Sequence, residues 1–145
     1  MSDLRAEHSR REAEAWEGFE AAVHRIPRDR WEGSDVLPGW SVKELLWHMA
    51  GWLEKCGRNL ERFGAGEPEE PGTGLSVDER NDRLAAEARD MTVDAVHDGL
   101  LAARKTVLER WQALPDVDAR AVEELADETY EHYDEHRLDL ERFPG

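Results

Sequence analysis

The sequence predicts an all-α fold, a four-helix bundle with a long crossover between its second and third helices. Apolar residues recur at helical spacing in four long segments. No segment alternates apolar and polar residues over enough positions to argue for a strand. With 145 residues, the chain is long enough for one substantial core. We therefore expect a single domain spanning residues 1–145.

The first two helices are predicted from their apolar stripes and their end signals. The first stripe covers about residues 2–26 and ends at Pro27, because proline cannot continue a helix. The second covers residues 41–63. It begins with Ser41 and Glu44, which are spaced for a capping box, and glycines follow its end.

Two further long helices follow after the crossover. The third is expected near residues 92–114, before Pro115, and the fourth over residues 121–143. A shorter helical stretch over residues 77–89 lies within the crossover itself.

The connection lengths predict how these helices are arranged. Only a few residues around 115–118 join the third helix to the fourth, so these two should be antiparallel neighbours. The connection over residues 64–91 is long enough to cross the bundle, which would leave the second and third helices parallel. The expected topology is up-down-down-up.

Three histidines are the candidate metal ligands. His132 and His136 are spaced i, i+4, so both imidazoles project from one helix face, about 6 Å apart along the axis. They occupy inward positions of an otherwise core-facing stripe, where unpaired polar groups would cost about 1–3 kcal/mol each. His48, on the flank of the second helix's stripe, is the third candidate. Antiparallel packing would bring it level with the pair, and three histidines leave a coordination position open.

The remaining histidines and the cysteine have simpler interpretations. His8 and His24 lie towards the ends of the first helix and are expected in solvent, and His97 is expected on the surface of the third helix. Cys56 falls on an apolar face and is interpreted as core. A single cysteine excludes an internal disulfide and a CxxC motif.

The amino-acid composition indicates which kinds of partner and which cellular compartment to expect. The chain carries 34 acidic and 19 basic residues, for a net charge of −15. This charge argues against nucleic acid and anionic membranes as partners, because both require a basic face. No apolar run approaches the roughly 18 residues of a membrane span, and the N-terminus lacks a signal-peptide core. A cytoplasmic protein with a small-molecule substrate is expected.

Two motifs give the chain a resemblance to a known superfamily. Residues 38–52 contain a W-S-x6-H-x3-W pattern that ends at Trp52 and includes His48, and His132 and His136 form an H-x-x-x-H pattern on the last helix. Both patterns resemble DinB-like proteins, including the N-terminal domain of mycothiol-dependent maleylpyruvate isomerases and the DfsB-type bundles. Residues 78–87 are similar to the linker helix of the DfsB type.

The resemblance implies a fold and a metal site. It implies an up-down-down-up bundle in which His48, His132 and His136 hold a divalent metal, usually zinc or nickel, and often a homodimer. Maleylpyruvate isomerases also carry a C-terminal domain. The sequence ends at Gly145 without one, which argues against that particular activity.

Two functional hypotheses remain open. A metal with three neutral imidazole ligands would make a bound water or thiol lose its proton more readily than when free. The preferred hypothesis is therefore a metal-dependent transferase or isomerase that uses a low-molecular-weight thiol on a small electrophilic molecule. The alternative is a non-catalytic bundle that binds a metal or small molecule, with a role in stress or toxin resistance. Glu44 and Glu128, each one turn before a candidate ligand, are placed to orient the rings, but in a chain with 37% charged residues the simpler interpretation is that both are surface charges.

The tryptophans are divided between core and surface. Trp16, Trp52 and Trp111 fall on core stripes, where large aromatic side chains fill space. Trp40 and Trp47 are better placed for a pocket lip or a dimer face.

Overall fold

The computed structural model describes residues 3–33 and 35–144. The described chain is mostly helical, which confirms the all-α class. None of the described helices is both long and apolar enough to cross a membrane. The helices are α1 (Leu4–His24), α2 (Val42–Gly64), α3 (Val77–Arg89), α4 (Val93–Ala113), α5 (Ala119–Glu128) and α6 (Tyr130–Arg142).

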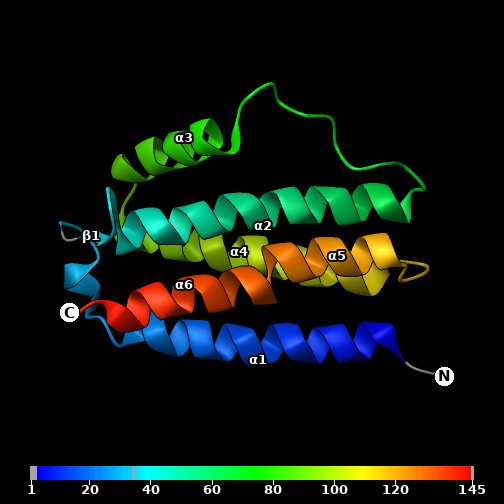
Figure 1. Cartoon of the computed structure of the whole chain (residues 1–145), viewed down its shortest axis with the longest axis horizontal. Coiled ribbons are helices and arrows are strands. Elements are labelled where there is room, and N and C mark those ends of the chain that lie inside the picture. The colour runs from blue at the N-terminus through cyan, green and yellow to red at the C-terminus, as the bar shows by residue number, and fades with distance from the viewer. Residues whose placement is uncertain (1–2, 34, 145) are drawn as a thin grey trace.

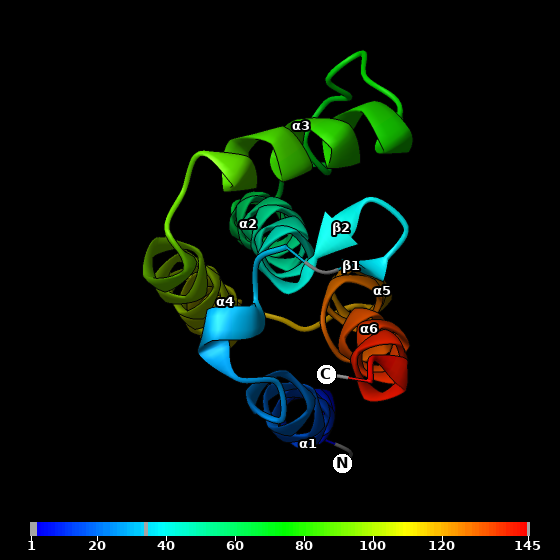
Figure 2. The ribbon, with the colours of Figure 1, turned by 90° about the vertical axis from the view of Figure 1, so that its left-hand side faces the viewer.

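The directions of the helices bring distant parts of the sequence to the same level. Helix α1 runs towards the end of the molecule where the strands lie, α2 and α4 both run away from that end, and α5 and α6 return to it (Figure 1). Viewed end-on, α1, α4, α2 and the α5–α6 pair surround a common centre, while α3 lies outside α2 (Figure 2). The start of α2 and the end of α6 therefore lie at the same end.

Polar side chains define where the helices begin. Ser41 and Glu44 form the predicted capping box of α2, and Ser76 and Glu79 form another at the start of α3. The Thr92 hydroxyl accepts a hydrogen bond from the backbone at the start of α4. The predicted start of the first helix at Ser2 lies outside the described residues.

The core is built from the apolar stripes of the long helices. Its largest members are fully buried and come from α1, α2, α4, α5, α6 and the segment after α1; they include Phe19, Trp31, Leu45, Leu53, Leu100, Trp111, Leu125 and Tyr133. Cys56 is also fully buried, as predicted. Each such side chain contributes about 1.5–3 kcal/mol of burial free energy, so apolar packing is a major source of the stability that holds the helices together.

The last predicted helix is interrupted, which corrects the single helix expected over residues 121–143. Thr129 separates α5 from α6 with φ −113° and ψ −96°. Its hydroxyl donates to the Leu125 carbonyl at 2.6 Å, a bond that competes with the helical ladder and bends the chain. The apolar spacing continues across the bend, so periodicity alone did not reveal it.

A short hairpin precedes α2, which corrects the expectation of no strand. Strands β1 (Asp35–Leu37) and β2 (Trp40–Ser41) pair antiparallel around a turn in which Gly39 has φ +84°. Strands this short cannot show a period-two pattern. The hairpin places Trp40 at the mouth of the site described below.

Helix α3 packs closely on α2. A Cβ atom at Gly51 would lie 2.6 Å from both methyl groups of Leu84, so a larger residue at this position would displace the Leu84 side chain. On the other side of the contact, the Trp47 indole donates to Glu87 at 3.0 Å. The crossover is thereby fixed beside the first half of α2, and Asn81 of α3 reaches His48.

Candidate metal centre

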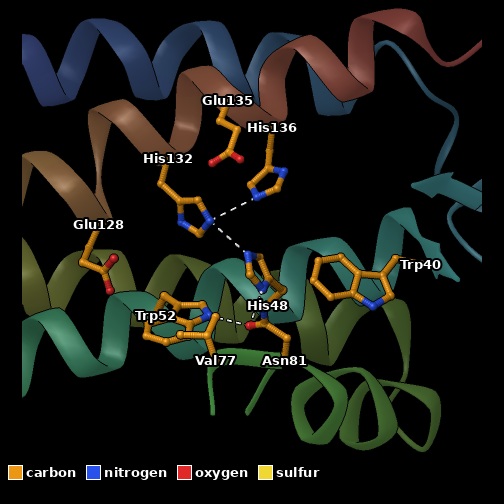
Figure 3. Close-up of a pocket in the computed structure, with 9 residues that line it drawn as sticks. All are labelled: Trp40, His48, Trp52, Val77, Asn81, Glu128, His132, Glu135 and His136. Carbon is orange, nitrogen blue, oxygen red and sulfur yellow. Dashed lines mark hydrogen bonds between the residues drawn. The ribbon is translucent and has the colours of Figure 1, made fainter. Parts of the chain in front are cut away.

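The structure brings the three predicted histidines together. His48 comes from α2, and His132 and His136 come from consecutive turns of α6 (Figure 3). The His132 Nε2 atom lies 2.9 Å from His48 Nε2 and 3.0 Å from His136 Nε2. Nitrogens that each lie about 2.0–2.1 Å from one tetrahedral ion are themselves about 3.3 Å apart, so a small outward shift of the rings would admit one. The three side chains form a group that could hold a metal ion.

The tautomer of His48 follows from its neighbours. The Trp52 indole N–H, which can only donate, lies 2.8 Å from Asn81 Oδ1. That amide atom is therefore an acceptor, and His48 Nδ1, 3.1 Å from the same oxygen, must carry the proton. The Nε2 atom of His48 consequently presents a lone pair to the other two rings.

His136 is oriented in the same way by a carboxylate. Its Nδ1 atom lies 3.0 Å from Asp139 Oδ2, one turn further along α6, and donates to it. The Nε2 atom of His136 therefore also presents a lone pair towards His132. Such acceptors on the far side of the ring are typical of metal-ligating histidines, because they fix the ring and raise its basicity.

His132 cannot satisfy both of its neighbours. Its Nε2 atom can offer at most one hydrogen to two facing lone pairs, and its buried Nδ1 atom has no hydrogen-bond partner among the described residues. Any tautomer leaves a polar atom unmatched in a site where His48 and His136 are only 5% and 6% exposed. A cation between the three Nε2 atoms would bind all three lone pairs, so these atoms fit a divalent metal. The His132 Nδ1–H group would still have no acceptor among the described residues.

Burial also keeps the rings ready to bind. The pKa of His48 is lowered to about 3, mainly by burial and then by repulsion from His136, while the bond to Asn81 opposes the shift. The pKa of His132 is lowered to about 2, by burial first and then by His136 and His48. Both imidazoles are neutral at pH 7, which is the form that binds metals.

The three-histidine site opens into a pocket of about 410 Å³. Apolar and polar side chains line it together, besides the three histidines: Trp40, Trp52, Val77, Asn81, Glu128 and Glu135. The Trp40 ring lies over His48 with ring centroids 4.7 Å apart. In Figure 3, Trp52 and Glu128 lie on one side of the histidines and Trp40 lies on the other, while Glu135 lies beside His132 and His136.

Comparison with known proteins identifies the family. Residues 13–132 match the family described as the mycothiol maleylpyruvate isomerase N-terminal domain. The chain belongs to this family. It is part of the DinB-like superfamily that the motifs predicted. No curated protein and no solved structure matched the chain.

The family match includes two of the three histidines. His48 and His132 lie within residues 13–132, while His136 lies four residues beyond the matched segment. The structure itself places His136 in the same group, through its contact with His132 and its bond to Asp139. The two sequence motifs and the structure therefore indicate the same three histidines.

Several side chains occupy places that the sequence did not predict. His8 and His97 were expected in solvent or on the surface but are 7% and 9% exposed, because each faces a neighbouring helix. Trp52, expected in the core, is a half-buried wall of the pocket. Glu44 is used in the capping box and in an ion pair with Arg89, and no bond joins it to His48.

Two orienting residues were missed by sequence reasoning. Asp139 lies three residues after His136, and that helical spacing could have identified it. Asn81 reaches His48 across 33 residues of sequence, from a helix whose packing no local pattern shows. Long-range contacts of this kind depend on the tertiary fold.

A buried group of charges adjoins the pocket. Lys55 Nζ lies 3.0 Å from Glu124 and 3.6 Å from Glu128. The pKa of Glu128 is raised to about 7, chiefly by burial; Lys55 opposes the shift and Glu124 adds to it. By contrast, burial raises the pKa of the Cys56 thiol, so this cysteine is not a reactive thiolate.

The depressed histidine pKa values predict how metal-free protein responds to acid. Below about pH 6.5 the unfolded chain protonates both His48 and His132, whereas the folded chain does so only near pH 3 and 2. Stability is therefore lost as pH falls below about 6.5, by at most about 1.4 kcal/mol per pH unit for each histidine. Glu128, whose pKa is raised, acts in the opposite direction between pH 7 and 4.5.

Urea unfolding of chelator-treated protein from pH 7 to 4 measures this loss. A variant with His48→Gln and His132→Gln should lose less stability over the same interval, since it retains Glu128 but lacks both titrating rings. If the free energy of unfolding fell equally with pH in the two proteins, the lowered pKa values of His48 and His132 would be contradicted.

Proposed function

We propose that the chain is a metal-dependent enzyme that transfers a low-molecular-weight thiol to a small electrophilic molecule, or isomerises such a molecule with the thiol's help. His48, His132 and His136 are the proposed ligands of a divalent metal, zinc or nickel. One observation supports the proposal most strongly: the Nε2 atoms of the three histidines lie together in a pocket of about 410 Å³, which is large enough for a small molecule.

The family supports the choice of a thiol. Its name describes the N-terminal domain of mycothiol-dependent isomerases, so mycothiol is the first thiol to test. A bound divalent metal would act as a Lewis acid that lowers the pKa of a thiol placed in its open coordination position. The proposal includes a single domain with up-down-down-up topology, supported by the helix directions (Figure 1), and a homodimer in the cytoplasm, as the superfamily resemblance implies.

The chain's own residues would position the reactants and accept the proton. Trp40 and Trp52 provide flat apolar walls for an unsaturated or aromatic electrophile. Asn81 and Asp139 hold the outer ligands His48 and His136 in place. Glu128 faces the pocket with a pKa near 7, which suits a group that takes the thiol proton at neutral pH.

A conjugation assay tests the function. Zinc- or nickel-loaded protein, incubated with mycothiol or other small thiols and a panel of electrophiles, should consume thiol faster than the uncatalysed reaction. His132→Gln should abolish the gain, because two imidazoles hold a divalent ion much less tightly than three. His8→Gln, a buried histidine outside the pocket, is the matched control and should remain active. Metal binding without any thiol consumption across the panel would favour the non-catalytic alternative.

A second substitution tests the role of Glu128. Glu128→Gln should leave metal content unchanged, because the side chain is not among the proposed ligands. It should lower the conjugation rate at neutral pH by about 10²-fold or more and remove the limb of the pH–rate profile near pH 7. Glu135→Gln, the same change at the pocket's other carboxylate, should keep that limb. If the limb of the pH–rate profile near pH 7 remained in Glu128→Gln, another group would have to accept the thiol proton.

A further inference from the structure

A second group of ligating side chains lies between α1 and α4. Glu20 and His24 are spaced i, i+4 on α1, and His97 faces them from α4. His24 Nε2 lies 3.1 Å from Glu20 Oε2, and His97 Nε2 lies 3.7 Å from Glu20 Oε1. The group shares no residue with the three-histidine site, and one ligating atom from each residue lies within 4.8 Å of the others.

Two atoms of this group are buried without partners. Glu20 Oε1 and His97 Nε2 have no hydrogen-bond partner among the described residues, and the 3.7 Å between them is too long for a hydrogen bond. His97 is only 9% exposed. Leaving such polar atoms unmatched destabilises the folded chain, so a further group bound between them would be stabilising.

We propose that Glu20, His24 and His97 form a second binding site for a divalent transition metal. Two imidazoles and one carboxylate suit zinc, nickel or cobalt, whereas magnesium and calcium prefer sites made of oxygen alone. The two residues on α1 provide a chelating pair on one helix face, and His97 closes the site from α4. An ion at this place satisfies both orphaned atoms at once.

Arg28 competes with the metal for His97. Its guanidinium lies 3.4 Å from His97 Nδ1 and donates to it, which places the ring proton on Nε2. Metal binding through Nε2 requires the proton on Nδ1, so Arg28 must turn away. Arg28 is 45% exposed and its shorter contact, 2.7 Å, is to Asp94. Its guanidinium also lies over the Trp31 ring, 4.8 Å from the centroid, so the movement must keep or replace that contact.

An ion at this site would join two parts of the fold. Helix α1 packs mainly along α6, and α4 packs mainly along α2. Figure 2 shows α1 and α4 as neighbours around the centre of the molecule. A metal held by α1 and α4 would therefore connect the two helix pairs. It would stabilise the folded chain by an amount that rises with the logarithm of the metal concentration once that concentration exceeds Kd.

Cobalt binding tests the proposal in a full-length chain whose three-histidine site is removed by His48→Gln and His132→Gln. This background should still bind one Co²⁺ per chain, with visible d–d absorption and a rise in melting temperature. Adding His97→Gln should weaken binding by more than about tenfold, and adding Arg28→Gln should strengthen it. Adding His8→Gln, the matched histidine control, should change neither the Co²⁺ affinity nor the rise in melting temperature.

The possible outcomes distinguish the proposed site at Glu20, His24 and His97 from the three-histidine site. A background protein that binds no Co²⁺, or His97→Gln binding as tightly as the background, would overturn the proposal. Should the background chain fail to fold, titration of the unmodified protein decides: two Co²⁺ per chain falling to one in His97→Gln supports the site, and an unchanged number refutes it.

Discussion

The functional site depends on one constraint, the meeting of three buried imidazole Nε2 atoms. These atoms carry too few protons for each of them to form a hydrogen bond with another. His48 and His136 are each committed to an outer acceptor, Asn81 or Asp139, so their inward lone pairs meet at His132. The apolar core brings the three rings together at a cost that hydrogen bonds among them cannot offset. A divalent cation bound there would resolve the conflict, and the same burial keeps His48 and His132 neutral, the form that binds metals.

The crossover contributes to the site as well as to the topology. It allows α2 and α4 to run in the same direction, so that α2 is antiparallel to α6 and His48 lies level with the pair (Figure 1). Its helix α3 then supplies Asn81, which holds both His48 and Trp52. The close approach at Gly51 makes this contact possible. A loosening of α3 would therefore affect the orientation of a ligand without touching the other two histidines.

Much of the architecture could be predicted because it depends on local patterns. Apolar periodicity identified the long helices, the Ser41–Glu44 spacing identified the start of α2, and the i, i+4 spacing identified His132 and His136 as neighbours. The bend at Thr129 was missed because it depends on a hydroxyl bond that leaves the apolar period intact.

The site's surroundings could not be predicted for a different reason. Asn81 contacts His48 only through the packing of α3 on α2. His97, at the border of its stripe, is buried because α1 covers that border. Such features depend on which helices become neighbours, and no residue spacing within one helix records this.

An anomalous-difference Fourier map of the crystallised protein, grown with one equivalent of zinc and measured at the zinc absorption edge, tests the central claim most directly. If the three histidines bind one metal, a peak is expected about 2.0–2.1 Å from the Nε2 atoms of His48, His132 and His136. Clear density for three ordered imidazoles with no anomalous peak between them would contradict it.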